Sequence, residues 1–226
     1  MNKNQPTCAK CKIKTPEKAC RKTDGNAPAF CPTKNIPEVL SSIEKIYADP
    51  KIREFARQAS IQEAEGYANR ELKLPVRYPV KNRLEEICEF ADRMGYKRLG
   101  LAYCGGLQQE ADAVNQVFEA AGFEVLSVVC KIGCRPKEEI GLNDQQKVRI
   151  GEFESMCNPI GQAKVLNQAG ADFNVVLGLC VGHDSLFFMN TTIPTTVLAV
   201  KDRVLGHNPL AAVYTLGSYS ERLIKK

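Results

Sequence analysis

The sequence lacks several features that would assign it to a familiar class of protein. Its 226 residues contain no Gly-x-Gly-x-x-Gly or Walker motif, so dinucleotide or triphosphate binding has little support. They also contain no internal repeat of fixed period and no low-complexity tract. Apolar runs such as Val175 to Val181 are too short to cross a bilayer, so we expect no membrane contact.

A secretory signal is also missing, because Met1 to Thr7 is polar and has no apolar stretch. We therefore expect a cytoplasmic protein whose thiols stay reduced. In a reducing compartment, cysteines serve more often as metal ligands or catalytic groups than as disulfides. The ten cysteines are thus the first candidates for function.

The composition, 44% hydrophobic and 25% charged, is that of a globular chain, but the net charge of +5 is uneven. Residues 1–35 carry eight Lys or Arg against two acidic residues, which gives +6 and leaves −1 for the rest. These cations could contact nucleic acid, compensate thiolates around a metal, or form solvated surface. We favour compensation over nucleic acid as a partner, because no aromatic residues interleave with the lysines from Lys10 to Lys22.

The chain is predicted to have three parts. Residues 1–35 have few apolar side chains and several prolines, so a cross-link must order them as a cysteine-rich metal module. Residues 36–80 form a helical connector, with one apolar stripe from Val39 to Ile46, a second helix from Asp49-Pro50 to about Ala68, and an extended stretch from Leu74 to Pro79.

Residues 81–226 are predicted to form an α/β domain. Near-continuous apolar strands at 99–103, 123–129, 173–179 and 195–200 alternate with helices that begin near Asn158-Pro159, Asp184 and Asn208-Pro209, among others. This alternation is typical of an open parallel, Rossmann-like sheet that is flanked by helices on both faces.

Four cysteines crowd the N-terminus with the spacing Cys8-x2-Cys11-x8-Cys20-x10-Cys31. There is one close pair, whereas a zinc ribbon usually offers two, and Cys31 precedes proline as the last ligand of a bacterial ferredoxin run does. The spacing also resembles the N-terminal iron-sulfur motifs of hybrid-cluster proteins and carbon monoxide dehydrogenases. These four cysteines are predicted metal ligands; a 4Fe-4S cluster is favoured, with zinc or unmetallated thiols as alternatives.

Further cysteines fall where predicted strands end and helices begin. Because such positions share one edge of a parallel sheet, the spacing predicts a second cofactor-binding centre there. Its predicted ligands are Cys104, Cys134, Cys157 and Cys180. Each could instead be a small buried hydrophobe. We prefer the buried-hydrophobe reading for Cys88, which lies on an apolar helix stripe. For Cys130 the buried-hydrophobe and functional readings are equally supported.

Both histidines also fall at this predicted edge. His183 is the candidate catalytic proton donor, while His207 is as well explained by a structural role in its loop. Lys201 and Arg203 could position an anionic substrate or form surface ion pairs.

The segments Met156 to Ala163, Gly178 to Asp184 and Lys201 to Pro209 resemble a family of uncharacterised metal-binding proteins. The resemblance extends to Cys8 to Cys11 and Phe123 to Lys131. That family is described as zinc-finger-like and is found largely in archaea and anaerobic bacteria. The resemblance implies metal binding in an anaerobe-compatible setting; it implies no reaction.

Together these patterns predict an iron-sulfur protein in redox or sulfur-transfer chemistry, with an electron-transfer or metalloenzyme partner and an unknown small-molecule substrate. If one of the four strand-end cysteines is not a ligand, an open iron position could bind that substrate. One alternative is a zinc-stabilised, non-catalytic binding module for a small molecule or a metalloprotein. Another is an enzyme whose nucleophile, Cys180, is activated by His183.

Overall fold

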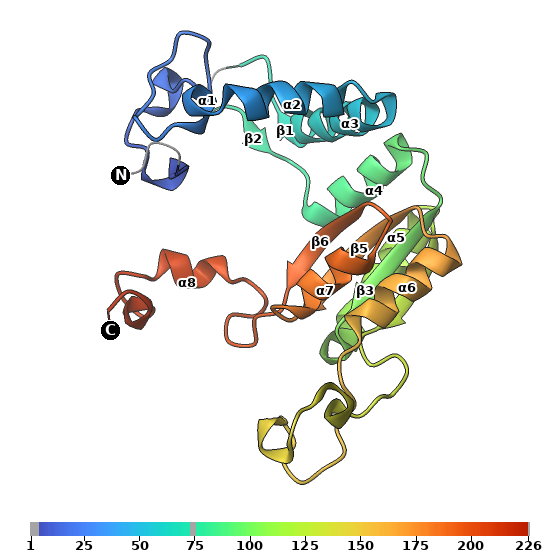
Figure 1. Cartoon of the computed structure of the whole chain (residues 1–226). Helices are drawn as coiled ribbons and strands as arrows, with labels where there is room; N and C mark the ends of the chain where they lie inside the picture. The colour runs from blue at the N-terminus through green and yellow to red at the C-terminus, as the bar shows by residue number, and fades with distance from the viewer. Residues whose placement is uncertain (1–4, 73–75, 226) are drawn as a thin grey trace. The chain divides into compact units, whose positions relative to one another are not determined.

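The computed structural model describes residues 5–72 and 76–225 (Figure 1). The chain divides into two compact units, the first ending at Ile61 and the second beginning at Gln62. The three-part division at residues 35 and 80 stays a prediction. No helix in the described parts of the chain is both long and apolar enough to cross a membrane.

The first unit consists of short turns and helices. Its elements are η1 (Cys8–Lys10), η2 (Thr15–Glu17), α1 (Pro32–Asn35), α2 (Pro37–Tyr47) and the greater part of α3 (Pro50–Glu65). None of the described residues 5–61 is buried, so this unit has no hydrophobic core. The predicted apolar stripe from Val39 to Ile46 does lie on α2, but it is exposed.

Helix α3 ends at Glu65, whereas the sequence predicted an end near Ala68. The helix stops because the following residues pair with another strand: β1 (Tyr67–Ala68) runs antiparallel to β2 (Tyr78–Pro79). The predicted extended stretch from Leu74 to Pro79 lies partly outside the described residues, and its last two residues form β2.

An open, four-stranded parallel sheet forms the centre of the second unit, which confirms the predicted α/β class. Its strands are β3 (Arg98–Tyr103), β4 (Glu124–Val129), β5 (Phe173–Leu179) and β6 (Thr195–Val200), in the order β4-β3-β5-β6. The chain passes outward from β3 to β4 and then crosses back over β3 to β5. The strand order therefore reverses between β3 and β5, and ligands of open α/β sheets bind at the carboxyl ends around such a point.

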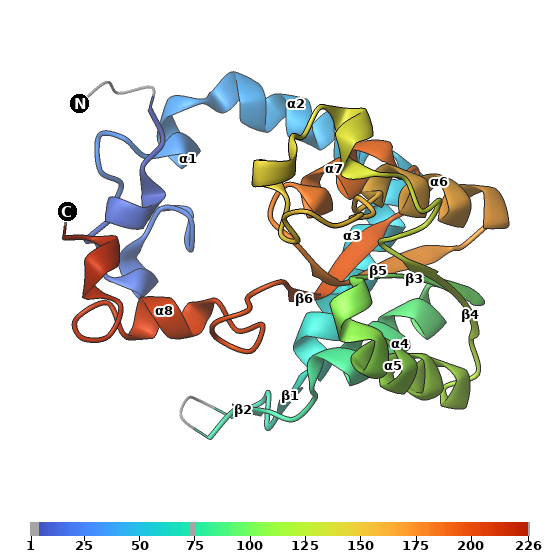
Figure 2. The ribbon, with the colours of Figure 1, turned by 90° about the horizontal axis from the view of Figure 1, so that it is seen from below.

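Helices cover both faces of this sheet, α4 and α5 on one side and α6 and α7 on the other (Figure 2). The helices of this unit are α4 (Arg83–Arg93), η3 (Gly105–Leu107), α5 (Gln108–Ala120), η4 (Lys137–Ile140), η5 (Asp144–Gln146), α6 (Pro159–Ala169), α7 (His183–Asn190), α8 (Leu210–Tyr214) and η6 (Glu221–Leu223). Phe118 of α5 and Phe187 of α7 are fully buried, and every residue of β5 is buried, so the core lies between the sheet and these helices.

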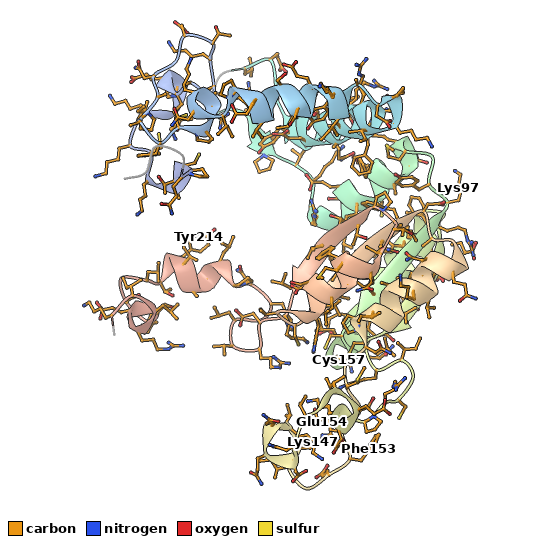
Figure 3. All side chains as sticks on the ribbon, in the orientation of Figure 1. Lys97, Lys147, Phe153, Glu154, Cys157 and Tyr214 are labelled. Atoms are coloured by element: carbon orange, nitrogen blue, oxygen red, sulfur yellow. The ribbon has the colours of Figure 1, made fainter. Side chains whose placement is uncertain are left out.

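Between β4 and α6 the chain makes a long excursion, residues 131–156, which we call the insertion. Lys147 bonds to the carboxylates of Asp144 at 2.7 Å and Glu138 at 2.8 Å and thereby ties its turns together. A bridge between Pro136 and Ser155 closes its base. The insertion therefore leaves the carboxyl edge of the sheet after β4 and returns there at Cys157 (Figure 3).

Candidate metal centre

The residues that directly follow the four strands lie in a row at the carboxyl edge of the sheet. They are Cys130 after β4, Cys104 after β3, Cys180 after β5 and Lys201 after β6. Sheet hydrogen bonds continue to these positions: the Cys130 N–H donates to the Tyr103 carbonyl at 2.9 Å and the Cys104 N–H to the Leu177 carbonyl at 3.0 Å. The row is therefore held by the backbone of the sheet.

Gly178 shapes the end of β5 just before Cys180. Its φ of +67° lies in the left-handed region, and the β5-β6 register shifts on either side of Leu177. A Cβ at this position would stand 2.0 Å from Leu107 Cδ1, so only glycine fits without movement. This irregular end of β5 directly precedes Cys180.

Cys157 reaches the same edge from the insertion. The next residue, Asn158, donates its N–H to the Cys130 carbonyl at 2.7 Å. Asn158 also caps α6, because its Oδ1 accepts from the Gly161 N–H at 2.8 Å, and its Nδ2 donates to the Ile132 carbonyl at 3.3 Å. These bonds hold Cys157 beside Cys130, at the base of the insertion (Figure 3).

Three thiols are thus brought together, and we call Cys104, Cys130 and Cys157 the sulfur triad. Cys130 is central: its thiol interacts with those of Cys104 and Cys157, and both of these residues pack against the buried cluster that contains Cys130. Cys130 is only 3% exposed, whereas Cys104 and Cys157 are half-buried. The Gly105 N–H also donates to Cys130 Sγ at 3.3 Å.

The contacts divide the triad into two acidic thiols and one that keeps its proton. The hydrogen bond from Cys130, the Gly106 N–H and Lys201 together lower the pKa of Cys104 to about 5. The hydrogen bond from Cys130, then His183 and Lys131, lower the pKa of Cys157 to about 4. The pKa of Cys130 is raised, because it stands between two thiolates and is buried.

Cationic side chains surround these sulfurs. The hydrogen bond with Cys157 raises the pKa of His183, so its imidazolium is favoured there. Lys201 hydrogen-bonds with Cys104, and Lys131 donates to the Ser155 carbonyl at 2.5 Å. Arg203 donates from Nη2 to Cys180 Sγ at 3.2 Å, which raises the guanidinium pKa. Positive charge thus accumulates where thiolates are stabilised.

The triad differs from the predicted second centre in its members. Cys134 is exposed and has a left-handed φ of 47°, in a turn where its N–H donates to the Lys131 carbonyl at 3.1 Å. This turn sends the chain into the insertion. Cys180 bonds to Arg203 instead of a triad thiol.

Cys130, on which the sequence analysis was undecided, is the central member of the triad. The sequence feature that could have identified Cys130 is its position directly after a strand, which Cys104 and Cys180 share.

The two histidines have different surroundings. His183, the first residue of α7, hydrogen-bonds with Cys157 in the triad. His207 instead closes a loop: its Nδ1 accepts from the Asp202 N–H at 3.1 Å, and its own N–H donates to the Asp202 carbonyl at 2.9 Å. His207 therefore has the structural role.

The N-terminal cysteines are all free thiols on short turns. The Cys11 N–H donates to the Cys8 carbonyl at 3.0 Å, which closes the turn between the close pair; Cys31 directly precedes α1. Cys8 and Cys20 are exposed, and Cys11 and Cys31 are half-buried. Within the described ranges, no group of three or more His, Cys, Asp or Glu side chains is arranged to hold a metal ion, and this holds for the sulfur triad as well as for the N-terminal cysteines. Metal ligation by the N-terminal cysteines stays a prediction.

Fold and site together define a cysteine-rich α/β protein with thiols at the carboxyl edge of a parallel sheet. The chain belongs to the family described as "Protein of unknown function (DUF1847)", whose profile matches residues 31–198. It is also similar to "Uncharacterized protein MJ0455" of Methanocaldococcus jannaschii, with 44% identity over 164 residues that cover 73% of this chain and 81% of the relative. These findings confirm the predicted resemblance to a family of uncharacterised proteins.

Among solved structures, the chain is similar to Dph2 from Pyrococcus horikoshii, whose crystal structure contains a 4Fe-4S cluster. The TM-score is 0.33 and the identity 18%, and the match covers 63% of this chain and 31% of that chain. A likeness at this TM-score carries no argument about the cofactor of the present protein.

Proposed function

We propose that the protein binds an iron-sulfur cluster through the sulfur triad and acts in redox or sulfur-transfer chemistry. The observation that carries the proposal is the interaction of Cys104, Cys130 and Cys157, which lie directly after β3, directly after β4 and just before α6. Of the three, Cys104 borders the point where strand order reverses, between β3 and β5, which is the usual ligand site of an open α/β sheet, and Cys130 follows the neighbouring edge strand β4.

The chemistry of the donors fits such a cluster. Iron-sulfur clusters are held by cysteine thiolates, and the pKa values of Cys104 and Cys157 favour that form near neutral pH. Backbone N–H bonds to the ligating sulfurs tune cluster potentials, and Gly105 supplies one to Cys130. The surrounding cations would offset the negative charge of three thiolates.

A triad of cysteines leaves one iron of a four-iron cluster without a protein ligand. When bound, such a group supplies electron transfer and an iron at which a substrate can coordinate. His183 would hold a proton beside Cys157 and is placed to serve as a proton donor. Lys201 and Arg203, at the end of β6, would attract an anionic substrate to the same edge.

We also propose that Cys8, Cys11, Cys20 and Cys31 hold a second metal group in the first unit. A segment of this size without a hydrophobic core needs a cross-link, and none of the described residues 5–61 is buried. A 4Fe-4S cluster there would serve as an electron relay, with an electron-transfer protein or metalloenzyme in the cytoplasm as partner. Zinc is the alternative, and it would make the first unit a structural module.

The test is metal and acid-labile sulfide content of the full-length protein after anaerobic purification. Three proteins are compared: wild type, a variant with Cys8, Cys11, Cys20 and Cys31 changed to Ser, and the double variant Cys104→Ser/Cys157→Ser. The proposal expects iron and sulfide in the wild type and in the N-terminal variant. In the double variant it expects loss of the iron and sulfide that the sulfur triad binds. Protein that contains zinc and no iron would reject the proposal and support the zinc-stabilised binding module.

A further inference from the structure

Cys104 and Cys130 lie opposite each other on neighbouring parallel strands. The register ends with the pair Tyr103 and Val129, Cys104 and Cys130 directly follow them, and the Cys130 N–H still donates to the Tyr103 carbonyl at 2.9 Å. Neighbouring strands are about 4.8 Å apart. Disulfide-bonded residues usually have Cα atoms about 4.4 to 6.8 Å apart. The two thiols are close enough to shift each other's pKa, and Cys104 packs against the buried cluster that contains Cys130.

We propose that Cys104 and Cys130 form a reversible disulfide when the protein meets a peroxide, which makes the pair a peroxide-reducing dithiol site. Accessibility divides the roles of the two thiols. Cys104 is half-buried and can meet a small oxidant, whereas Cys130 is buried directly behind it. Cys104 is therefore the thiol that peroxide oxidises first, and Cys130 is the resolving thiol.

The reaction proceeds in two steps. The sulfur of Cys104 attacks one oxygen of hydrogen peroxide and breaks the O–O bond, which gives a sulfenic acid at Cys104 and one water. Cys130 then attacks the sulfenic sulfur and displaces its oxygen as a second water, and the S–S bond forms. The two thiols together lose two electrons and two protons, and peroxide is reduced to two waters. A dithiol returns the pair to its reduced state by thiol-disulfide exchange.

Cys157 is the competing partner, since its thiol also hydrogen-bonds with Cys130. The backbone of Cys157 is less directly opposed to Cys130, because Cys157 precedes α6 and is not part of the sheet. The backbone link is the bond from the N–H of the next residue, Asn158, to the Cys130 carbonyl. The Cys157 thiol also hydrogen-bonds with His183. The strand register therefore assigns the disulfide to Cys104.

This inference concerns the chain without a cluster and does not rest on the proposed function, because a disulfide and a cluster use the same sulfurs. The two proposals can therefore fail separately. A protein that contains no iron but forms the disulfide would support this inference and reject the cluster. A protein that holds iron yet forms no Cys104–Cys130 disulfide after metal removal would do the reverse.

The experiment uses full-length protein that has been freed of metal by a chelator without oxygen, reduced, desalted and treated with hydrogen peroxide. Remaining thiols are alkylated with iodoacetamide, and the protein is digested with trypsin without reductant. Trypsin cuts after Arg98 and Lys131, so one peptide, residues 99–131, contains both cysteines. Cys157 lies in a different peptide, residues 150–164, bounded by Arg149 and Lys164.

We expect peptide 99–131 to lose two hydrogens, to carry no alkyl group, and to become doubly alkylated after dithiothreitol. Cys157→Ser should leave this result unchanged. In Cys130→Ser, Cys104 should stop at the sulfenic acid, which dimedone captures. Either of two results on the wild-type chain would overturn the inference: a peptide 99–131 that stays doubly alkylated after peroxide, or one that is linked to peptide 150–164 instead. Because these readouts use wild-type protein, they do not depend on the folding of a variant.

Discussion

The thiol of Cys157 and the imidazole of His183 interact and shift each other's pKa, although 25 residues lie between them in the sequence. Cys157 precedes the first turn of α6 and His183 begins α7. The interaction lowers the pKa of the thiol and raises that of the imidazole, so a thiolate and an imidazolium face each other. The first prediction concerns this pair.

His183→Gln should raise the pKa of Cys157, because it removes a cation and a donor that favour the thiolate. In metal-free, reduced protein, the midpoint of the pH profile for Cys157 alkylation, about 4 in the wild type, should move upward, and alkylation at pH about 4 should slow by roughly fivefold for a rise of one pKa unit. The measurement is the iodoacetamide rate of peptide 150–164 against pH. His207→Gln is the control, because His207 only closes its own loop. Identical profiles for both variants would show that the imidazole does not act on the thiol.

The lowered pKa values of Cys104 and Cys157 predict how stability depends on pH. A group whose folded pKa is depressed contributes stability that is present above its unfolded pKa, about 9 for cysteine here, and is lost as pH falls through its folded pKa. Metal-free, reduced protein should therefore lose stability between about pH 9 and pH 4.

Urea unfolding at several pH values checks this dependence. The double variant Cys104→Ser/Cys157→Ser should show a flatter curve, and Cys134→Ser, whose thiol is exposed outside the sulfur triad, should follow the wild type. Equal slopes in all three proteins would contradict the assigned thiolates.

Gly178→Ala should destabilise the second unit more than Gly95→Ala does. Both glycines have positive φ, 67° and 71°, so both substitutions incur the left-handed cost of about 1 to 2 kcal/mol. At Gly178 the new Cβ would also stand 2.0 Å from Leu107 Cδ1, while at Gly95 nothing lies within 4 Å. Overpacking should add about 1 to 3 kcal/mol at Gly178, measurable by urea unfolding. Equal destabilisation by the two substitutions would mean that the irregular end of β5 is not fixed by its packing.

Asn158→Ala should disturb Cys157 as well as the stability of α6. Asn158 and Asn82 both cap helices, so replacing either should cost about 0.5 to 2 kcal/mol. Only Asn158 also ties the chain beside Cys157, through the Ile132 carbonyl. We expect a changed alkylation rate of Cys157 in Asn158→Ala and an unchanged rate in Asn82→Ala. The same rate in both variants would show that the cap does not position the thiol.

Much of the sheet could be predicted because its residues carry strong local signals. The strand Phe173–Leu179 is a continuous apolar run, and Asn158-Pro159 and Gly170 mark the two ends of α6. The end of α3 was predicted too late, because the pairing of Tyr67 and Ala68 with Tyr78 and Pro79 is not local. Periodicity carries no information about such a partner.

The candidate site was only partly predictable. Position after a strand pointed to Cys104 and Cys180, and the helix start pointed to Cys157. The choice between Cys130 and Cys134 depended on the path of the insertion, which has no sequence periodicity. The sequence analysis placed Cys134 among the predicted ligands, but the turn there leads the chain into the insertion, while the sheet hydrogen bond to Tyr103 holds Cys130 at the edge of the sheet.

The central claim is that Cys130, and not Cys134, helps to bind a cluster at the carboxyl edge of the sheet. Its most direct test is the iron content per chain of Cys130→Ser and Cys134→Ser, each in a protein whose four N-terminal cysteines are already serine, after anaerobic reconstitution with iron and sulfide. We predict that Cys134→Ser retains the iron of its parent and Cys130→Ser loses most of it. Equal iron in the two variants, or none in the parent, would contradict the account.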